Sequence, residues 1–217
     1  MLSVMRAAQR TSSSRRYDWH DFIALPDDDR RELVDGELVE IEVPNNWHEA
    51  LVAILMFHLH GWARTRRRRV LASGYKVRIR SDRGAMPDVQ VSKESAYRGA
   101  NPQGLDDGHP QLAIEILSPS SRYHNRVRKA EWYASIGVPE YWIVDVDARS
   151  LERFVLRCGA HALKEQVVGD EDFRPTSMKG LVIPLAPIWD AITPRKKKSL
   201  ASAKKPVARS RRSASRK

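Results

Sequence analysis

Two short stretches decide how this chain folds: Met86-Pro87-Asp88-Val89-Gln90-Val91 and Gln111-Leu112-Ala113-Ile114-Glu115-Ile116-Leu117-Ser118. Both are rich in branched apolar residues, which is typical of β-strands. Each also holds one carboxylate where a charge is costly. Glu115 has five apolar neighbours, so we expect its strand to be buried on both faces. Its charge must then be paired, protonated or bound to a metal ion.

Asp88 follows Pro87, which favours an extended entry into the strand. Two carboxylates on neighbouring strands can converge on one point, as a hard divalent cation requires. The residue types leave other interpretations open. Asp88 can cap a strand, and Glu115 can face solvent at a sheet edge or pair with an arginine.

The composition limits the class of protein. A chain of 217 residues suits one domain with terminal extensions. The lone cysteine, Cys158, excludes an internal disulfide and a cysteine-built zinc site, and it is consistent with a reducing, cytoplasmic location. The longest apolar run, residues 50–57, is far shorter than the roughly 20 residues of a membrane-spanning helix, so we expect no membrane partner.

The net charge of +11 belongs to the ends of the chain. Residues 191–217 hold eleven Lys or Arg and no acid, residues 1–16 hold four Arg and no acid, and residues 17–190 carry a net charge of −4. We predict a folded domain over residues 17–190 between two disordered basic extensions. The C-terminal tail either attracts nucleic acid non-specifically or serves only solubility.

Local patterns predict the other elements. A helix capped by Asp18 ends before Pro26, and Asp35-Gly36 between apolar runs predicts a hairpin over residues 32–43. Further elements are a helix from N-cap Asn46 to the arginine run 64–69, a strand 70–80, a loop 93–110, a helix 122–136, a strand 140–146 and a C-terminal hairpin within 151–168.

Two features of the helix that begins at Asn46 have alternative interpretations. His48 lies in its first turn, either as a surface residue or as part of a site. The arginines of 64–69 suit a helix C-terminus, and they are either a solvated face or contacts for phosphate groups.

From Asn46 the predicted order is helix, strand, strand, strand, helix, strand. This order resembles the core of the restriction-endonuclease-like, PD-(D/E)XK superfamily, an α+β fold with a mixed central sheet. Pro87-Asp88, Glu115 to Ser120, Lys129, Tyr133 and Gly137 to Trp142 look like the Uma-two family, as do Glu32 to Leu38 and His48. The resemblance covers residues 17–190.

The chain departs from the superfamily pattern at one position. A lysine usually follows two residues after the second acid, and here that position is Leu117. The family resemblance implies that Lys129, on the following helix, replaces it. Lys76 is a second candidate. Without either amine near the acids, the site is expected to bind but not cut.

The resemblance implies a Mg²⁺- or Mn²⁺-dependent endonuclease that acts on DNA and is compatible with a homodimer. Asp88, Glu115 and the Ile116 carbonyl would hold the metal, Lys129 would act at the reacting phosphate, Glu32 would complete the shell or hold a water, and His48 would be an accessory residue. The alternative is an inactive nuclease fold that binds nucleic acid through its basic tail.

Overall fold

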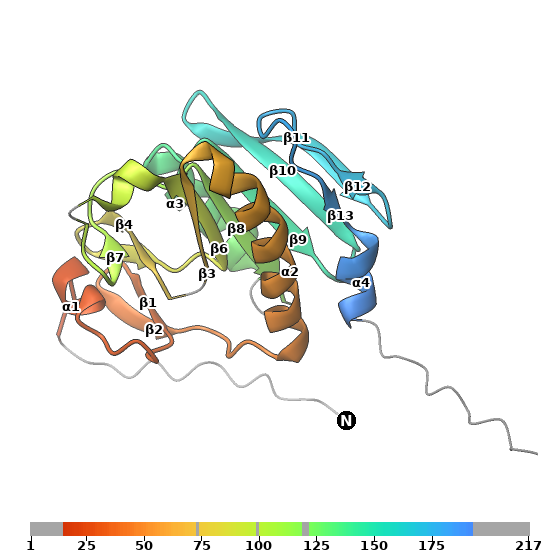
Figure 1. The fold of residues 1–217 in the computed structure, drawn as a ribbon. Coiled ribbons are helices and arrows are strands. Elements are labelled where there is room, and N and C mark those ends of the chain that lie inside the picture. The colour runs from red at the N-terminus through yellow and green to blue at the C-terminus, as the bar shows by residue number, and fades with distance from the viewer. Residues whose placement is uncertain (1–14, 73, 99, 119–121, 193–217) are drawn as a thin grey trace, which may run out of the picture.

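The computed structural model describes residues 15–192 except 73, 99 and 119–121. A six-stranded sheet forms its centre, in the order β11-β10-β9-β8-β6-β3 (Figure 1). Strands β8 and β9 are parallel and the other neighbouring pairs are antiparallel. The strands are β3 (Arg68–Ala72), β6 (Val89–Lys93), β8 (Leu112–Leu117), β9 (Glu140–Asp145), β10 (Ser150–Arg157) and β11 (Ala160–Val168). The predicted mixed α+β fold is confirmed, and so is the C-terminal hairpin.

Strand β8 lies in the middle of this sheet, and all six of its residues are buried. Successive side chains point to opposite faces of a strand. Leu112, Ile114 and Ile116 belong to one hydrophobic cluster, whereas Ala113 and Leu117 belong to another. Glu115 therefore points into the second of two separate cores, which is why its charge needs a partner.

Helices cover both faces of the central sheet. On one face lie α2 (Asn46–Ala63) and α4 (Ala186–Ile192), and on the other lies α3 (Ala130–Ser135), preceded by a π-helical segment, η3 (His124–Lys129). The Asn45 side chain accepts the N–H groups of Trp47 and His48 at 3.2 and 3.1 Å. The N-cap of α2 is thus Asn45, not Asn46 as predicted, because the Asn45 side chain satisfies two free amides of the first turn.

A second sheet packs beside the first, in the order β2-β1-β5-β4-β7. Its strands are β1 (Arg31–Val34), β2 (Glu37–Glu40), β4 (Lys76–Arg80), β5 (Arg83–Ala85) and β7 (Gly104–Leu105). The predicted hairpin turns at Asp35 and Gly36, both with positive φ. Helix α1 (Trp19–Ile23), capped by Asp18 as predicted, packs on this sheet. Gly84 is required there, since a Cβ would lie 2.7 Å from the Phe22 ring.

The predicted strand 70–80 is wrong as a single element. Its first part is β3 in the central sheet and its second part is β4 in the other sheet. Gly74 lies between them with φ +104, which breaks the extended backbone. The expected loop 93–110 also contains a short helix, η2 (Glu94–Tyr97), and the strand β7.

The remaining elements are η1 (Arg64–Arg66), β12 (Asp172–Phe173) and β13 (Ile183–Pro184). None of the helices in the described part of the chain has the length and apolar character needed to cross a membrane. Of the predicted disordered extensions, residues 1–16 and 191–217, all but four residues lie outside the described part of the chain. Residues 191 and 192 belong to α4, so the folded part extends two residues beyond the predicted boundary at 190.

Candidate active site

The register of β6 and β8 brings the two predicted acids together. Val89 pairs with Ile114, Gln90 with Ala113 and Val91 with Leu112. Asp88 directly precedes β6 and Glu115 directly follows the last paired residue of β8, so continuing the register by one step brings the two residues next to each other. The two carboxylates, 27 positions apart in the chain, therefore come close enough for the charge of Asp88 to act on Glu115.

Asp88 is held from two sides. Its Oδ2 accepts the Ile116 N–H at 2.7 Å, and its Oδ1 lies 3.2 Å from His48 Nε2. Burial lowers the pKa of His48, but the Asp88 carboxylate outweighs it and raises the pKa above its ordinary value. His48 thus orients Asp88 from the first turn of α2. The Ile116 amide is the group that contacts Asp88, and the role of the Ile116 carbonyl as a metal ligand stays a prediction.

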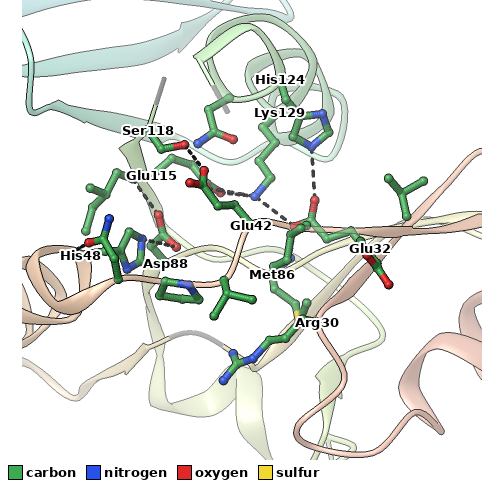
Figure 2. Close-up of a pocket in the computed structure, with 18 of the residues that line it drawn as sticks. Arg30, Glu32, Glu42, His48, Met86, Asp88, Glu115, Ser118, His124 and Lys129 are labelled. Atoms are coloured by element: carbon green, nitrogen blue, oxygen red, sulfur yellow. Dashed lines mark hydrogen bonds and ion pairs between the residues drawn. The ribbon is translucent and has the colours of Figure 1, made fainter. Parts of the chain in front are cut away.

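Lys129 occupies the centre of the site. Its Nζ lies 3.0 Å from both carboxylate oxygens of Glu115 and 3.0 Å from Glu32 Oε1. Figure 2 shows the side chain reaching between the two acids. Leu117, the usual lysine position, packs in the second core instead. Lys76 is absent from the site, because it donates to the Leu25 carbonyl at 3.4 Å near α1.

Glu32 comes from the second sheet. It is 1% exposed, and it accepts the Met86 N–H at 2.9 Å and contacts His124 Nε2 at 3.2 Å. Burial raises its pKa, but Lys129, His124 and the Met86 amide together lower the pKa of Glu32 to about 2. Glu32 is therefore a fixed anion that holds Lys129 in place.

Glu115 has the opposite electrostatic character. Burial, together with the nearby charges of Asp88 and Glu32, raises the pKa of Glu115 to about 8, although Lys129 and the Tyr133 hydroxyl oppose this. Tyr133 donates to Glu115 at 2.7 Å. One lysine thus leaves the negative charge of this cluster incompletely balanced, and a further cation would balance it.

The acids line a cavity of about 680 Å³ that opens beside the N-terminus of α2 and the β1–β2 hairpin (Figure 2). The hairpin and the segment after it contribute apolar side chains to the lining, namely Val34, Val39, Ile41, Val43 and Pro44. The same segment also contributes Glu42, whose carboxylate accepts the Ser118 hydroxyl at 2.5 Å. The cavity's ionisable residues are Arg30, Glu32, Glu40, Glu42, His48, Asp88, Glu115, His124 and Lys129. Acids outnumber permanent cations, so anionic phosphate would enter only with an additional cation.

Sequence reasoning missed His124, Tyr133, Glu42 and Ser118 as site residues. His124 precedes Lys129 by five positions, which in an α-helix places them on different faces. A π-helical segment bonds residue i to residue i+5, so it brings both side chains toward Glu32. Nothing in the sequence pattern announces a π-helical segment, whereas Tyr133 did carry a signal, since it lies one turn after Lys129.

Ion pairs fix this π-helical segment to the sheet. Arg126 donates to Asp145 at 2.8 Å and to Glu152 at 2.7 and 2.9 Å, and Arg122 also pairs with Asp145. The Asp145 side chain is only 2% exposed. The position of Lys129 therefore depends on charges at the end of β9 and on β10.

Replacing Asp145 with asparagine should lower the free energy of unfolding at pH 7 by about 2–3 kcal/mol, because it leaves two arginines without their shared partner. Burial opposes ionisation, but both arginines and the Ala148 amide lower the pKa of Asp145 from 3.8 to about 2. The wild-type stabilisation is therefore present above pH 4 and lost as the pH falls toward 2. Urea denaturation between pH 2 and 7 tests this. Asp147→Asn, at a side chain 66% exposed, is the control and should change stability by less than about 0.5 kcal/mol.

The carboxylate oxygens of the site suit a hard cation that takes only a few of its ligands from the protein. Among the described residues, no three His, Cys, Asp or Glu side chains are arranged to hold a metal ion. Asp88 and Glu115 offer carboxylate oxygens on one face, and Mg²⁺ is commonly held by one or two carboxylates with water and substrate phosphates. The incompletely balanced charge of Glu115 fits the same ion. Asp88 and Glu115 are thus the residues that would hold it.

Comparisons with known proteins give the family of the chain and a solved structure of similar fold. The Uma2 family model, described as "Putative restriction endonuclease", matches residues 19–186. The solved structure of a "putative nuclease belonging to DUF820" from Anabaena variabilis is similar at a TM-score of 0.63 and 17% identity, covering 79% of this chain and 97% of its own. At that identity the likeness shows the fold. No curated protein matches the chain.

Proposed function

Because this chain belongs to the Uma2 family of restriction-endonuclease-like proteins, we propose that it is a metal-dependent endonuclease that hydrolyses phosphodiester bonds of DNA. One observation carries the proposal: Lys129 Nζ lies 3.0 Å from Glu115, which is also near enough to Asp88 to interact with its charge. An acid pair with a neighbouring amine is what this hydrolysis needs. The same distance supports an enzyme over the alternative of an inactive binding fold.

Mg²⁺ or Mn²⁺ supplies two effects when bound: it lowers the pKa of a water molecule and offsets charge on the phosphate. The rest falls to the protein. Asp88 and Glu115 would hold the ion, with Asp88 oriented by His48 and Glu115 by Tyr133. Lys129 donates hydrogen bonds where negative charge develops, and Glu32 keeps it in that position.

The reaction balances with water as the only co-substrate. A water oxygen forms a new bond to phosphorus, the bond from phosphorus to the leaving sugar oxygen breaks, and the proton lost by water is matched by one gained at the leaving oxygen. DNA as substrate, Mg²⁺ or Mn²⁺ as cofactor and action as a homodimer are all parts of this proposal.

The test is nicking of supercoiled plasmid with Mg²⁺ or Mn²⁺. Asp88→Ala should reduce the rate by at least about 100-fold, because one of two metal-holding carboxylates is lost. Asp88→Asn, which keeps the shape that contacts His48 and Ile116, separates this effect from misfolding. Asp147→Ala, at an exposed aspartate, should keep the wild-type rate. Nicking that survives both Asp88 variants would refute the proposal.

A further inference from the structure

A strongly basic surface lies at the other end of α2 from the active site. We call it the arginine patch and define it as the five arginines of 64–69 with Lys93 and Lys179. The fold brings these residues together. Arg68 lies opposite Lys93 in the antiparallel pairing of β3 and β6, and Arg66 donates to the Lys179 carbonyl at 3.1 Å. Residues 64–69 follow α2 and lead into β3, a junction that can be followed in Figure 1.

The patch carries charge that its surroundings do not balance. Glu94 is the only acid in residues 64–69 and 93–98. Within the described residues, none of the cations of the patch forms a salt bridge, whereas Arg31, Arg80 and Arg174 elsewhere on the surface each pair with an aspartate. Clustered like charges repel each other, so this surface is suited to an anionic partner.

Two guanidinium groups of the patch are already held in place. Arg66 stacks on the Trp62 ring at 5.0 Å and also donates to the Trp62 carbonyl at 2.8 Å. Arg69 stacks on the Tyr97 ring at 4.8 Å. Holding long side chains before binding reduces the conformational entropy lost on binding. The patch is therefore preorganised, unlike a freely solvated row of arginines.

From this geometry we propose that the arginine patch binds the phosphodiester backbone of double-stranded DNA at a distance from the cleaved bond. Arginine forks match phosphate oxygens in pairs. Trp62 and Tyr97 lie beneath guanidinium groups and are part-buried, so they offer little apolar surface to a membrane. The choice of DNA as the polyanion rests on the proposed function.

The distance sets the length of duplex that can use both surfaces. His48, in the active site, and Arg64 are sixteen residues apart along α2, which corresponds to about 24 Å. That is about seven base pairs of B-form duplex. A duplex of about 20 base pairs can reach both surfaces, whereas one of about 5 base pairs cannot.

The experiment measures binding of the full-length protein to a 20-base-pair duplex by fluorescence anisotropy, in EDTA and over a range of salt concentrations. The variant Arg64→Gln/Arg67→Gln/Arg69→Gln changes three exposed cations of the patch. The control Arg157→Gln/Lys164→Gln/Arg174→Gln removes the same charge from exposed cations elsewhere. We expect the patch variant to bind at least about 10-fold more weakly and its salt slope to fall by about 2–3, with wild-type behaviour in the control.

An unchanged salt slope in the patch variant, or equal losses in patch and control variants, would overturn the inference. So would patch-dependent binding to vesicles of phosphatidylserine and phosphatidylcholine that exceeds binding to the duplex, because the partner would then be a membrane. The EDTA measurement separates this inference from the proposed function: absence of nicking alongside patch-dependent binding would refute only the nuclease proposal.

Discussion

Replacing Lys129 with methionine should abolish plasmid nicking and lower the free energy of unfolding by about 3–5 kcal/mol. Methionine is close to lysine in length and fills the same space, so the loss isolates the charge. Without the ammonium group, Glu32 and Glu115 are left as buried acids without their shared cation. Urea denaturation and nicking assays on the same preparation measure both effects.

Lys76 provides a matched control, since it is also a buried lysine and was the second candidate for the missing catalytic amine. It is 3% exposed, but within the described residues it forms no salt bridge, and its ammonium group donates to the Leu25 carbonyl and lies 5.1 Å from the centre of the Phe22 ring. Burial lowers the pKa of Lys76, so its charge is a cost to the fold. Lys76→Met should keep nicking and change stability by less than about 1 kcal/mol. Lost nicking in Lys76→Met with activity retained in Lys129→Met would reverse the assignment.

Asp88 and Glu115 could be predicted as site residues because the sequence places each carboxylate in an apolar strand, where burying a charge is unfavourable. A glutamate among five apolar residues is expected to be buried, and a buried carboxylate must be paired, protonated or bound to a metal ion. Asp88, after Pro87 at the start of another strand, is the second carboxylate that could share such an ion. The family resemblance added Glu32, His48 and Lys129, and the structure brings these three side chains to the same cavity.

Other features of the fold depend on contacts that no local pattern records. Strand-forming residues occur on both sides of Gly74, so residues 70–80 were predicted as one strand and the transfer of the chain to a second sheet was not predicted. His124 reaches Glu32 only through the π-helical segment, which ion pairs to Asp145 and Glu152 hold against the sheet. Gly74 permits the first feature and is visible in the sequence, but which sheet each strand joins, and the π-helical segment, depend on tertiary packing.

Replacing Glu115 with glutamine should separate activity from stability. Nicking should fall by at least about 100-fold, because a neutral amide is a poor ligand for a hard cation. In EDTA the variant should be as stable as the wild type or more stable, by up to about 2 kcal/mol, since burial makes the Glu115 charge costly and Lys129 keeps its partner Glu32. Adding Mg²⁺ should raise the melting temperature of the wild type and leave that of the variant unchanged.

Glu140 makes the contrast decisive, because it is a buried glutamate on the neighbouring strand with a full set of partners. It accepts two hydrogen bonds from Arg153 and one from Trp142, all at 2.9 Å, and these lower its pKa despite burial. Glu140→Gln should therefore lower the free energy of unfolding by about 2–3 kcal/mol while nicking continues. We thus expect the same substitution to have opposite effects on stability at two buried positions. If Glu115→Gln loses as much stability as Glu140→Gln, Glu115 is a structural ion-pair partner of Lys129 and not a ligand for a cation.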